Sequence, residues 1–483
     1  MKTRTEAATD VAPWIGLSFV LLSFVFRLIN AVVTTSELPV FQTEFGISSA
    51  DAELTLTLFL AIAGALIVPI GMLADRYGRV TVFTYGTVTM IVANVITALS
   101  PNFTILLASR VLEAIAFPAM GVASLALVVG AFSDQRRKAL AISFYGASYG
   151  LGLTLAVVLG GFFTTDVSWR WSFAMNVPVL IVALIGVRRS FTSKADRHPG
   201  RPIDWAGGIF LLGILTTLLI ALDQGPTSGW DGLAGVLILA CLIFAVTLVA
   251  QQRWAAGRGK PAIFDAQVMD TPGFRPAITV GFLMMFGGFA VVTVVPILWV
   301  LTQDSSPIQV GLGLSTLGIG WMAGALLSVR MGRRYGARKS VISGLILAAA
   351  GLAATALIGV PSESLVTTAP CLALLGIGMG IAYARINEAG LQRMPETHTS
   401  QGSGLLIGFR LIGGGLGSAL LAQFLLLTAT NAAEKAITSD AALSSAQQQE
   451  LTQTIGAIGR GRYGSLFTDE LKPTLESATV DIT

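Results

Sequence analysis

The chain has 483 residues, of which 53% are hydrophobic and only 12% are charged, and its mean hydropathy is +0.74. A soluble core cannot bury that much apolar surface, so the composition excludes a soluble globular protein and indicates a polytopic membrane protein. The formal net charge is +4, but the basic residues lie in short gaps between apolar segments, so the charge does not indicate a nucleic-acid partner.

Apolar runs of membrane-spanning length follow one another along most of the chain. Thirteen of them are predicted to be transmembrane helices, all α-helical because a helix satisfies its own backbone hydrogen bonds in lipid. The predicted helices are 14–33, 54–73, 82–99, 105–132, 139–163, 171–187, 205–222, 233–250, 277–301, 308–329, 341–360, 367–386 and 403–427. The expected fold class is therefore an all-α polytopic membrane protein.

The longest basic gap, RRSFTSKADRHPGRPID, follows the sixth helix and divides the chain. The predicted units are a six-helix bundle at 1–187, a basic loop with two inserted helices at 188–272, a five-helix bundle at 273–427, and a polar extracytoplasmic tail at 428–483. Two facing bundles with a binding site between them at the membrane midplane are typical of secondary transporters.

Lysine and arginine residues occupy every second gap between the predicted helices. The alternate gaps at 38–51, 100–104, 223–232, 302–307 and 361–366 contain none, and Arg170 is the one exception. Because basic loops stay on the cytoplasmic side, the N-terminus is expected in the cytoplasm and the protein in the inner (plasma) membrane. Thirteen crossings would then leave the C-terminus outside.

The first apolar run ends in a polar stripe, FRLINAVVTTSELP. Arg27, Asn30, Thr34 and Glu37 are spaced so that they share one face of a helix. Charge at membrane depth is costly and usually faces a pathway or a partner, so this face is expected to line a water-filled path inside the first bundle. The alternative is that Glu37 lies in the aqueous mouth beside Pro39 and merely stays hydrated.

A proton-coupled transporter needs a carboxyl group that changes its charge beside an arginine, and desolvation brings a buried carboxyl group into the working range. Glu113 lies one turn from Arg110 on the same helix face and is the first candidate for the proton site. Glu37 is the second. Arg385 and Glu388 repeat the spacing in the twelfth helix. The alternative for both pairs is that they neutralise themselves and hold helices together.

A substrate cavity is expected between the bundles, since methionine and aromatic side chains adapt to varied apolar or cationic ligands. The alternative is that these side chains are packing or lipid-facing surface. The residues expected to line the cavity are Arg27, Asn30, Tyr145, Tyr149, Met285, Phe289, Arg385, Glu388 and Arg410.

Several classes of chemistry are not expected. Cys241 and Cys371 lie in apolar runs without a CxxC motif or a nearby histidine, so the sequence predicts neither a disulfide framework nor a metal site. There is no Walker sequence, and no motif combines a nucleophile, a base and an orienting group. Neither an ATP-driven pump nor an enzyme is expected, and no cofactor.

Three motifs show a family resemblance: GMLADRYGR at 71–79, SWRWSFAMNVP at 168–178 and FRLIGGGLG at 409–417. With them the chain resembles the fourteen-helix drug:proton antiporters of the major facilitator superfamily. The resemblance implies a major facilitator fold, two six-helix-type bundles with two inserted linker helices, working by alternating access. It also implies a cytoplasmic latch loop between the halves, formed by Gly71, Asp75, Arg76, Gly78 and Arg79.

The sequence departs from the family pattern at several positions. Asn30 stands where the family has an aspartate, Glu113 and Ala114 replace a Gln-Gly pair, and Arg333 replaces the aspartate in the second copy of the loop motif. Ala156 begins the dipeptide that replaces the Gly-Pro of the antiport signature. The fourteenth helix is absent.

These observations lead to one main expectation and two alternatives. We expect a monomeric secondary transporter that exports small amphipathic compounds, such as drugs or antibiotics, with small molecules, protons and the lipid bilayer as its partners. The first alternative is a proton symporter or facilitator for uptake of a small metabolite. The second is a non-transporting membrane sensor or assembly protein.

Overall fold

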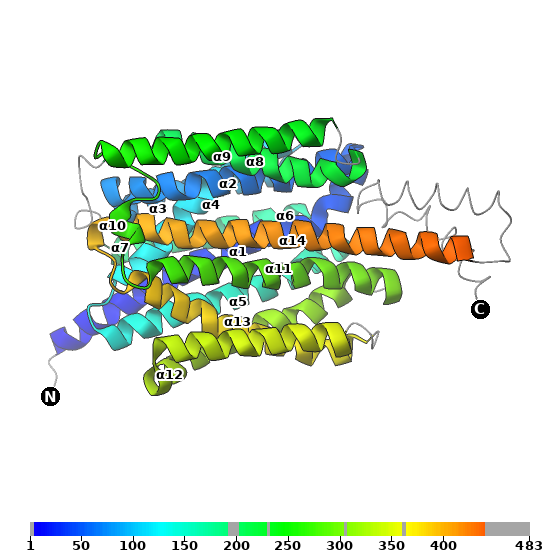
Figure 1. Ribbon diagram of the computed structural model, residues 1–483. Helices are drawn as coiled ribbons and strands as arrows, with labels where there is room; N and C mark the ends of the chain where they lie inside the picture. The colour runs from blue at the N-terminus through cyan, green and yellow to red at the C-terminus, as the bar shows by residue number, and fades with distance from the viewer. Residues whose placement is uncertain (1–3, 192–201, 229–231, 304–306, 360–363, 440–483) are drawn as a thin grey trace.

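The computed structural model describes residues 4–191, 202–228, 232–303, 307–359 and 364–439, and these residues form an all-α architecture of helices that run side by side (Figure 1). A π-helical turn, Thr355–Gly359, and a 3-10 turn, Glu396–His398, complete the described elements. The α-helices are α1 (Arg4–Phe45), α2 (Ser49–Tyr77), α3 (Arg79–Ala98), α4 (Phe103–Gly130), α5 (Gln135–Asp166), α6 (Arg170–Ala174), α7 (Asn176–Ser190), α8 (Trp205–Ser228), α9 (Leu233–Gly257), α10 (Ala266–Met269), α11 (Phe274–Gln303), α12 (Pro307–Ala354), α13 (Leu365–Leu391) and α14 (Thr399–Ser439).

Twelve stretches of the described residues are long and apolar enough to cross a membrane, so the prediction of an all-α polytopic membrane protein is confirmed. One of them, Ile308–Gly359, has 52 residues and contains most of α12. It is interrupted at Gly336, whose φ of 78° is a left-handed conformation that glycine adopts without strain. Its two arms match the helices predicted at 308–329 and 341–360, so the thirteen predicted crossings are accounted for.

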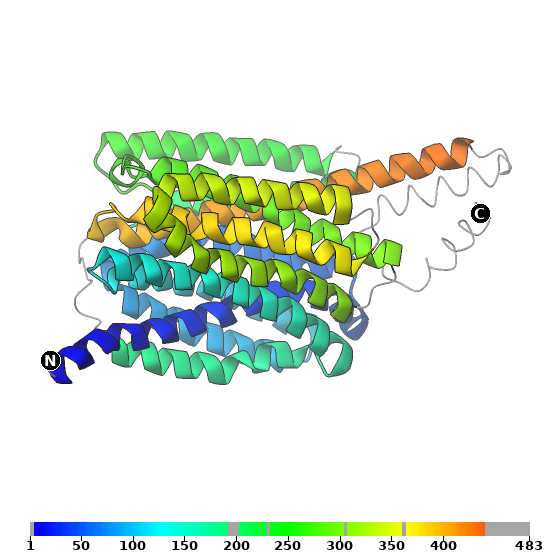
Figure 2. The same ribbon diagram turned by 90° about the horizontal axis from the view of Figure 1, so that it is seen from below.

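Two helices extend beyond their predicted ends. α1 was predicted to stop at 33 but continues through Pro39 to Phe45, and this extension keeps Glu37 inside a helix. α14 continues past 427 into the first part of the predicted tail, while residues 440–483 lie outside the described residues. With 41 residues, α14 is about 60 Å long. It therefore projects beyond the other helices at one end of the bundle (Figures 1 and 2).

The helices form two halves, α1–α7 and α11–α14, which meet where α5 packs on α12 and α13 and where α2 and α4 pack on α14. Glycine allows the closest of these approaches. A Cβ atom on Gly150 of α5 would lie 2.7 Å from the backbone nitrogen of Met322 on α12, and it would also collide with the carbonyl oxygen of Gly318. The two halves therefore touch backbone to backbone along this line.

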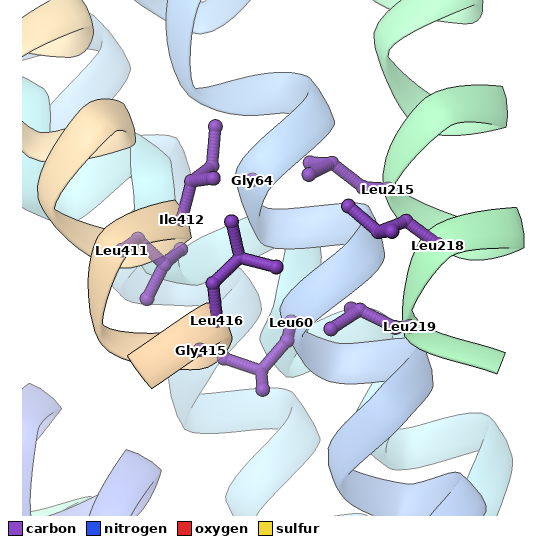
Figure 3. Close-up of a pocket in the computed structure, with 9 residues that line it drawn as sticks. All are labelled: Leu60, Gly64, Leu215, Leu218, Leu219, Leu411, Ile412, Gly415 and Leu416. Carbon is purple, nitrogen blue, oxygen red and sulfur yellow. The ribbon is translucent and has the colours of Figure 1, made fainter. Parts of the chain in front are cut away.

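The inserted pair, α8 and α9, lies at the edge of the molecule beside α2 (Figure 1). Asp204, which precedes α8, accepts hydrogen bonds from the side-chain amides of Gln251 and Gln252 on α9 at 3.0 and 2.7 Å, and from the backbone nitrogen of Ile263 at 3.1 Å. Leucine, isoleucine and glycine residues of α2, α8 and α14 line a crevice of about 20 Å³ between these helices (Figure 3). The crevice is entirely apolar, so it is a packing gap and not a binding site.

Candidate functional site

A buried polar network fills the interior of the first half, where α1, α3, α4 and α7 meet. Asn30 donates through Nδ2 to Oδ1 of Asn94 at 2.6 Å, and the same Oδ1 accepts from Asn176 at 3.1 Å. Arg110 donates through Nη1 to Oδ1 of Asn30 at 3.3 Å and forms an ion pair with Glu113. All five side chains are buried. The polar stripe of the first helix therefore faces the interior of its own half and not lipid.

The ion pair between Arg110 and Glu113 is completely enclosed, with both side chains 0% exposed. Oε1 of Glu113 accepts a hydrogen bond from the hydroxyl of Thr97 at 3.0 Å, and this hydroxyl lies 2.7 Å from that of Ser109. Within the described ranges, Nε and Nη2 of Arg110 have no hydrogen-bond partner. The guanidinium group thus keeps two donors for a second acceptor.

Glu37 lies beside this pair and is also 0% exposed, so the alternative of a hydrated carboxylate in the aqueous mouth is wrong. The reason is the extension of α1, which carries Glu37 into the interior of the half. Its carboxylate interacts electrostatically with Arg110 and Glu113 and lies near Ser172 of α6. Neither of its oxygen atoms has a hydrogen-bond partner among the described residues. Two carboxylates and one arginine carry one excess negative charge, which a single proton removes.

In the second half, Arg385 and Glu388 form an ion pair on α13. Nη2 of Arg385 donates to the hydroxyl of Ser143 on α5 at 3.0 Å, and that hydroxyl lies 3.3 Å from the hydroxyl of Ser328 on α12. This pair therefore takes part in a contact between the halves, which favours the structural alternative for it.

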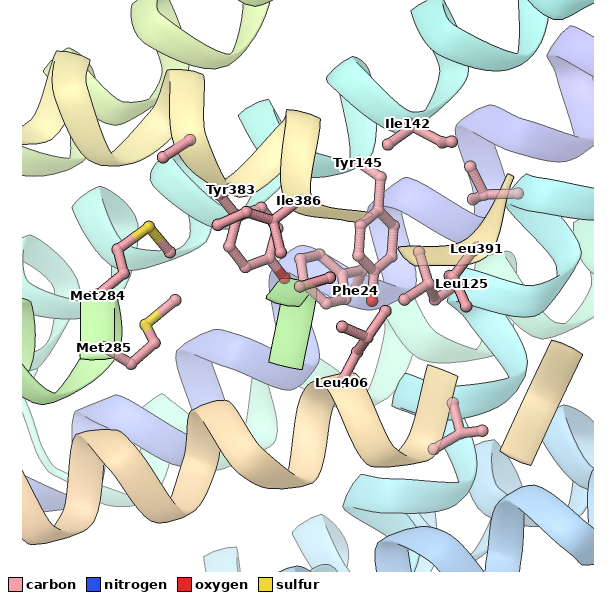
Figure 4. Packing of buried hydrophobic residues seen from close by; sticks show 14 of the residues in the cluster. Phe24, Leu125, Ile142, Tyr145, Met284, Met285, Tyr383, Ile386, Leu391 and Leu406 are labelled. Atoms are coloured by element: carbon pink, nitrogen blue, oxygen red, sulfur yellow. The ribbon is translucent and has the colours of Figure 1, made fainter. Parts of the chain in front are cut away.

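An aromatic cluster closes the boundary between the halves. Tyr149 of α5 stacks on Trp321 of α12 with ring centroids 4.7 Å apart and lies 5.2 Å from Tyr383 of α13. Tyr145, one turn earlier on α5, lies 4.2 Å from Phe24 of α1. Figure 4 shows Phe24 between the rings of Tyr145 and Tyr383. Side chains of both halves thus meet in one aromatic cluster.

Two other predicted cavity residues lie on α11. Met285 is buried in the same hydrophobic core as the tyrosines and lies with Met284 on the side of the cluster where Tyr383 lies (Figure 4). Phe289 packs against α14, where its ring lies 3.2 Å from the place that a Cβ atom on Gly414 would take. Phe289 therefore fills a helix contact, whereas Met285 lies near the boundary of the halves.

Two buried arginines approach the aromatic cluster, one from each half. Arg27 of α1 donates to the carbonyl oxygen of Phe117 at 3.2 Å, and its guanidinium carbon lies 3.9 Å from the centre of the ring of Phe117. Arg410 of α14 donates to Oδ1 of Asn387 at 2.8 Å and lies 4.4 Å from the centre of the ring of Tyr383.

The junction of α2 and α3 joins the two halves at one end of the bundle. The predicted loop at 71–79 is a break of one residue, Gly78, because Asp75 lies in α2, which ends at Tyr77, and Arg79 begins α3. Asp75 is buried, and its two carboxylate oxygens accept hydrogen bonds from the backbone nitrogens of Ser400 and Gln401, each at 3.0 Å. Both nitrogens lie in the first turn of α14, where helices leave donors unpaired and favour a negative charge. Gly71 permits this approach, because a Cβ atom there would lie 2.7 Å from the carbonyl oxygen of Ser400.

Arg79 strengthens the same junction. Its Nη2 donates to the carbonyl oxygen of Glu396 in the second half at 3.0 Å, and its Nη1 donates to that of Ala126 in the first half at 3.4 Å. Gly78, just before it, has a φ of 96°, which a residue with a side chain would adopt only under strain. Arg76 is half-buried, and its guanidinium carbon lies 5.1 Å from the centre of the ring of Tyr77.

Sequence reasoning missed several residues of these contacts. In the sequence, Asn94 and Asn176 are single amide side chains inside apolar runs. This isolated polarity was the one feature that could have indicated a buried polar contact. Ser143 carries no pattern that distinguishes it from other small residues in membrane helices. Ser400 and Gln401 take part through their backbone nitrogens, which no side-chain motif records.

A groove of about 610 Å³ runs along α2, α3 and α4, next to the junction of α2 and α3. Arg76, Tyr77 and Tyr85 line it, and both tyrosines are exposed. None of the residues of the polar network or of the aromatic cluster lines this groove. The groove is therefore separate from both.

Known proteins are similar to this chain in sequence and in fold. The sequence model of the Major Facilitator Superfamily matches residues 17–418. The puromycin resistance protein pur8 of Streptomyces alboniger is 26% identical over 85% of this chain and 82% of its own length. The multidrug transporter protein MdtP of Bacillus subtilis is 24% identical over 95% of this chain and 77% of its own.

Solved structures agree on the fold. The human organic anion transporter MFSD10 (TETRAN) superposes with a TM-score of 0.62 at 14% identity, covering 93% of this chain and 98% of its own. The proton:xylose symporter XylE superposes with a TM-score of 0.58 at 12% identity, covering 94% of this chain and 95% of its own. At such low identity these likenesses establish the fold alone.

Proposed function

Because the chain belongs to the Major Facilitator Superfamily, we propose that it is a secondary transporter that exports small amphipathic compounds in exchange for protons. The relatives named for puromycin resistance and multidrug transport support export as the direction and foreign compounds as the cargo. Members of this family are transporters and not enzymes. The protein is accordingly a multi-pass membrane protein with small molecules and protons as partners.

The observation that carries this proposal is the enclosed group formed by Glu37, Arg110 and Glu113. An unpaired charge at membrane depth is costly, so the group is most stable when it holds one proton and is neutral. When Glu113 takes the proton, Arg110 loses its partner, and its free Nε and Nη2 atoms can pair with Glu37 instead. Glu37 lies on α1, whereas Arg110 and Glu113 lie on α4. When Arg110 changes its partner from Glu113 to Glu37, the binding of a proton therefore moves α1 relative to α4.

The contacts between the halves support alternating access. The junction of α2 and α3 closes one end through Asp75, and backbone contact at Gly150 gives α5 and α12 a surface without interlocking side chains. In the proposed orientation, with the N-terminus in the cytoplasm, this closed end is the cytoplasmic one. Opening it requires that the carboxylate of Asp75 leave the start of α14.

The test is proton movement in everted membrane vesicles with an acidic interior, followed by a pH-sensitive dye while drug-like compounds are added. An exported compound enters the vesicle and lets protons out, so the gradient falls. We expect this response with the parent protein and its loss with Glu113→Gln, which removes the exchangeable charge but keeps the shape of the side chain.

The matched control is Glu44→Gln, which removes a carboxylate from a half-exposed ion pair with Arg170. This variant is expected to move protons as the parent does. If no compound lowers the gradient, or if Glu113→Gln responds like the parent, proton-coupled export is refuted. Accumulation of a solute driven by the gradient would then favour uptake.

A further inference from the structure

Two buried arginines beside the aromatic cluster have no carboxylate partner among the residues that the structure describes. The guanidinium carbon of Arg410 lies 4.4 Å from the centre of the Tyr383 ring, and that of Arg27 lies 4.9 Å from the centre of the Phe24 ring, which is 4.2 Å from the ring centre of Tyr145. Both arginines are buried. Neither takes part in an ion pair within the part of the chain that the structure describes. By contrast, Arg110 and Arg385 each have a glutamate one turn away, and the buried Arg79 lies at one end of the bundle, where it donates to backbone carbonyl oxygens.

The hydrogen-bonding capacity of the two arginines is also incompletely used. Within the described residues, Nε of Arg27 and both Nε and Nη2 of Arg410 lack a partner, and so does the hydroxyl of Tyr145. The faces of the neighbouring aromatic rings attract the guanidinium groups, but they do not neutralise the two positive charges. An enclosed region with two cations and several free donors is suited to receive an anion that accepts hydrogen bonds.

The positions of the two arginines are built in a similar way. Each lies over a glycine of a neighbouring helix: a Cβ atom on Gly121 of α4 would lie 2.9 Å from Nη1 of Arg27, and one on Gly281 of α11 would lie 3.0 Å from Nε of Arg410. Side chains at these two glycines would push the guanidinium groups away. The helices thus leave room for each arginine beside the boundary of the halves.

We infer that the substrate of this transporter is an organic anion, with one oxyanion group held between Arg27 and Arg410 and an apolar or aromatic body against the tyrosines. This inference rests on the proposed export function and names its substrate class. A hydrophobic cation would meet two unbalanced positive charges at the same place and is repelled. Because the arginines come from different halves, the anion also links the halves electrostatically while it is bound.

The test compares three naphthalene compounds that differ in charge at similar size: 2-naphthalenesulfonate, 2-naphthalenesulfonamide and trimethyl(2-naphthyl)ammonium. Binding to the purified full chain is measured by titration calorimetry. We expect the sulfonate to bind at least tenfold more tightly than the other two. Arg27→Gln and Arg410→Gln should each weaken its binding at least tenfold, and Arg27→Lys should weaken it less than Arg27→Gln.

The control is Arg275→Gln, which removes an exposed arginine whose partner is Asp270 and should leave binding unchanged. The comparison of the three compounds on the parent protein needs no variant and decides the question even if a variant fails to fold. Equal or tighter binding of the ammonium compound overturns the inference, as does sulfonate binding that survives both Gln variants.

The vesicle assay separates this inference from the proposed function. If only cations release the proton gradient, export stands and the anion assignment falls. If the sulfonate binds in an arginine-dependent manner but moves no protons, the anion site stands and proton-coupled export falls.

Discussion

The contact of Asp75 with the start of α14 predicts that Asp75→Asn opens one end of the transporter. The variant removes a charge that accepts two backbone hydrogen bonds at 3.0 Å. Hydrogen bonds to a charged group contribute about 1.5–3 kcal/mol each, and a carboxylate at a helix start up to about 2 kcal/mol in buried geometries. These contributions overlap, and the asparagine keeps one acceptor. We therefore expect a loss of about 2–3 kcal/mol, which shifts the closed–open equilibrium roughly 30- to 150-fold.

The shift is measurable as a distance between spin labels on the two halves. Tyr77 ends α2 and Arg338 follows the bend of α12 at Gly336, and both side chains are exposed. Labels attach to cysteine, so Cys241 and Cys371 are first replaced by alanine. Pulsed electron resonance on the parent should show one short population, and Asp75→Asn should add a longer one.

The control for this experiment is Asp134→Asn. Asp134 accepts a hydrogen bond from the backbone nitrogen of Arg137 at 2.9 Å and so caps a helix start as Asp75 does, but both partners belong to the first half. It should leave the distances unchanged. Unchanged distances in Asp75→Asn, or the same change in both variants, would refute the reasoning that this carboxylate holds the halves together.

Two further predictions concern packing. Gly150→Ala should lower the free energy of unfolding by about 1–3 kcal/mol and slow transport, because its Cβ atom would press on the backbone of α12. The control is Gly287→Ala, which should change neither, because a Cβ atom at Gly287 would have nothing within 4 Å. Asp204→Asn should destabilise α8 and α9 by about 1–3 kcal/mol, measured by hydrogen exchange, because four hydrogen bonds converge on this carboxylate. It should leave proton-coupled transport intact, and a loss of transport would show that the inserted pair takes part in it.

The fold could be predicted from the sequence because the bilayer imposes simple rules on it. Length and hydropathy alone located every crossing, including the two arms on either side of Gly336, since no other backbone arrangement satisfies its hydrogen bonds in lipid. Helix ends were harder. α1 continues past 33 because Thr34 and Glu37 are buried against other helices, and hydropathy counts such residues as polar wherever they lie.

The candidate site was only partly predictable for a related reason. Spacing placed Arg110 beside Glu113 because both lie on one helix, where geometry is fixed. It could not place Asn94 or Asn176 next to Asn30, since those contacts depend on how three helices pack. Spacing also could not show that the two buried arginines of the second half differ. Arg385 forms an ion pair with Glu388, whereas Arg410 has no carboxylate partner among the described residues.

The arrangement of α1 suggests how the two sites communicate. Arg27 lies at the boundary of the halves and Glu37 in the enclosed carboxylate group, about 15 Å apart along one helix face. Asn30 lies between them and accepts a hydrogen bond from Arg110, so a change of partner by this arginine acts on the helix that carries Arg27. In the proposed mechanism, a proton bound near Glu37 and an anion bound at Arg27 therefore bias the position of the same rigid element. Such a shared element is the physical requirement for coupling two sites.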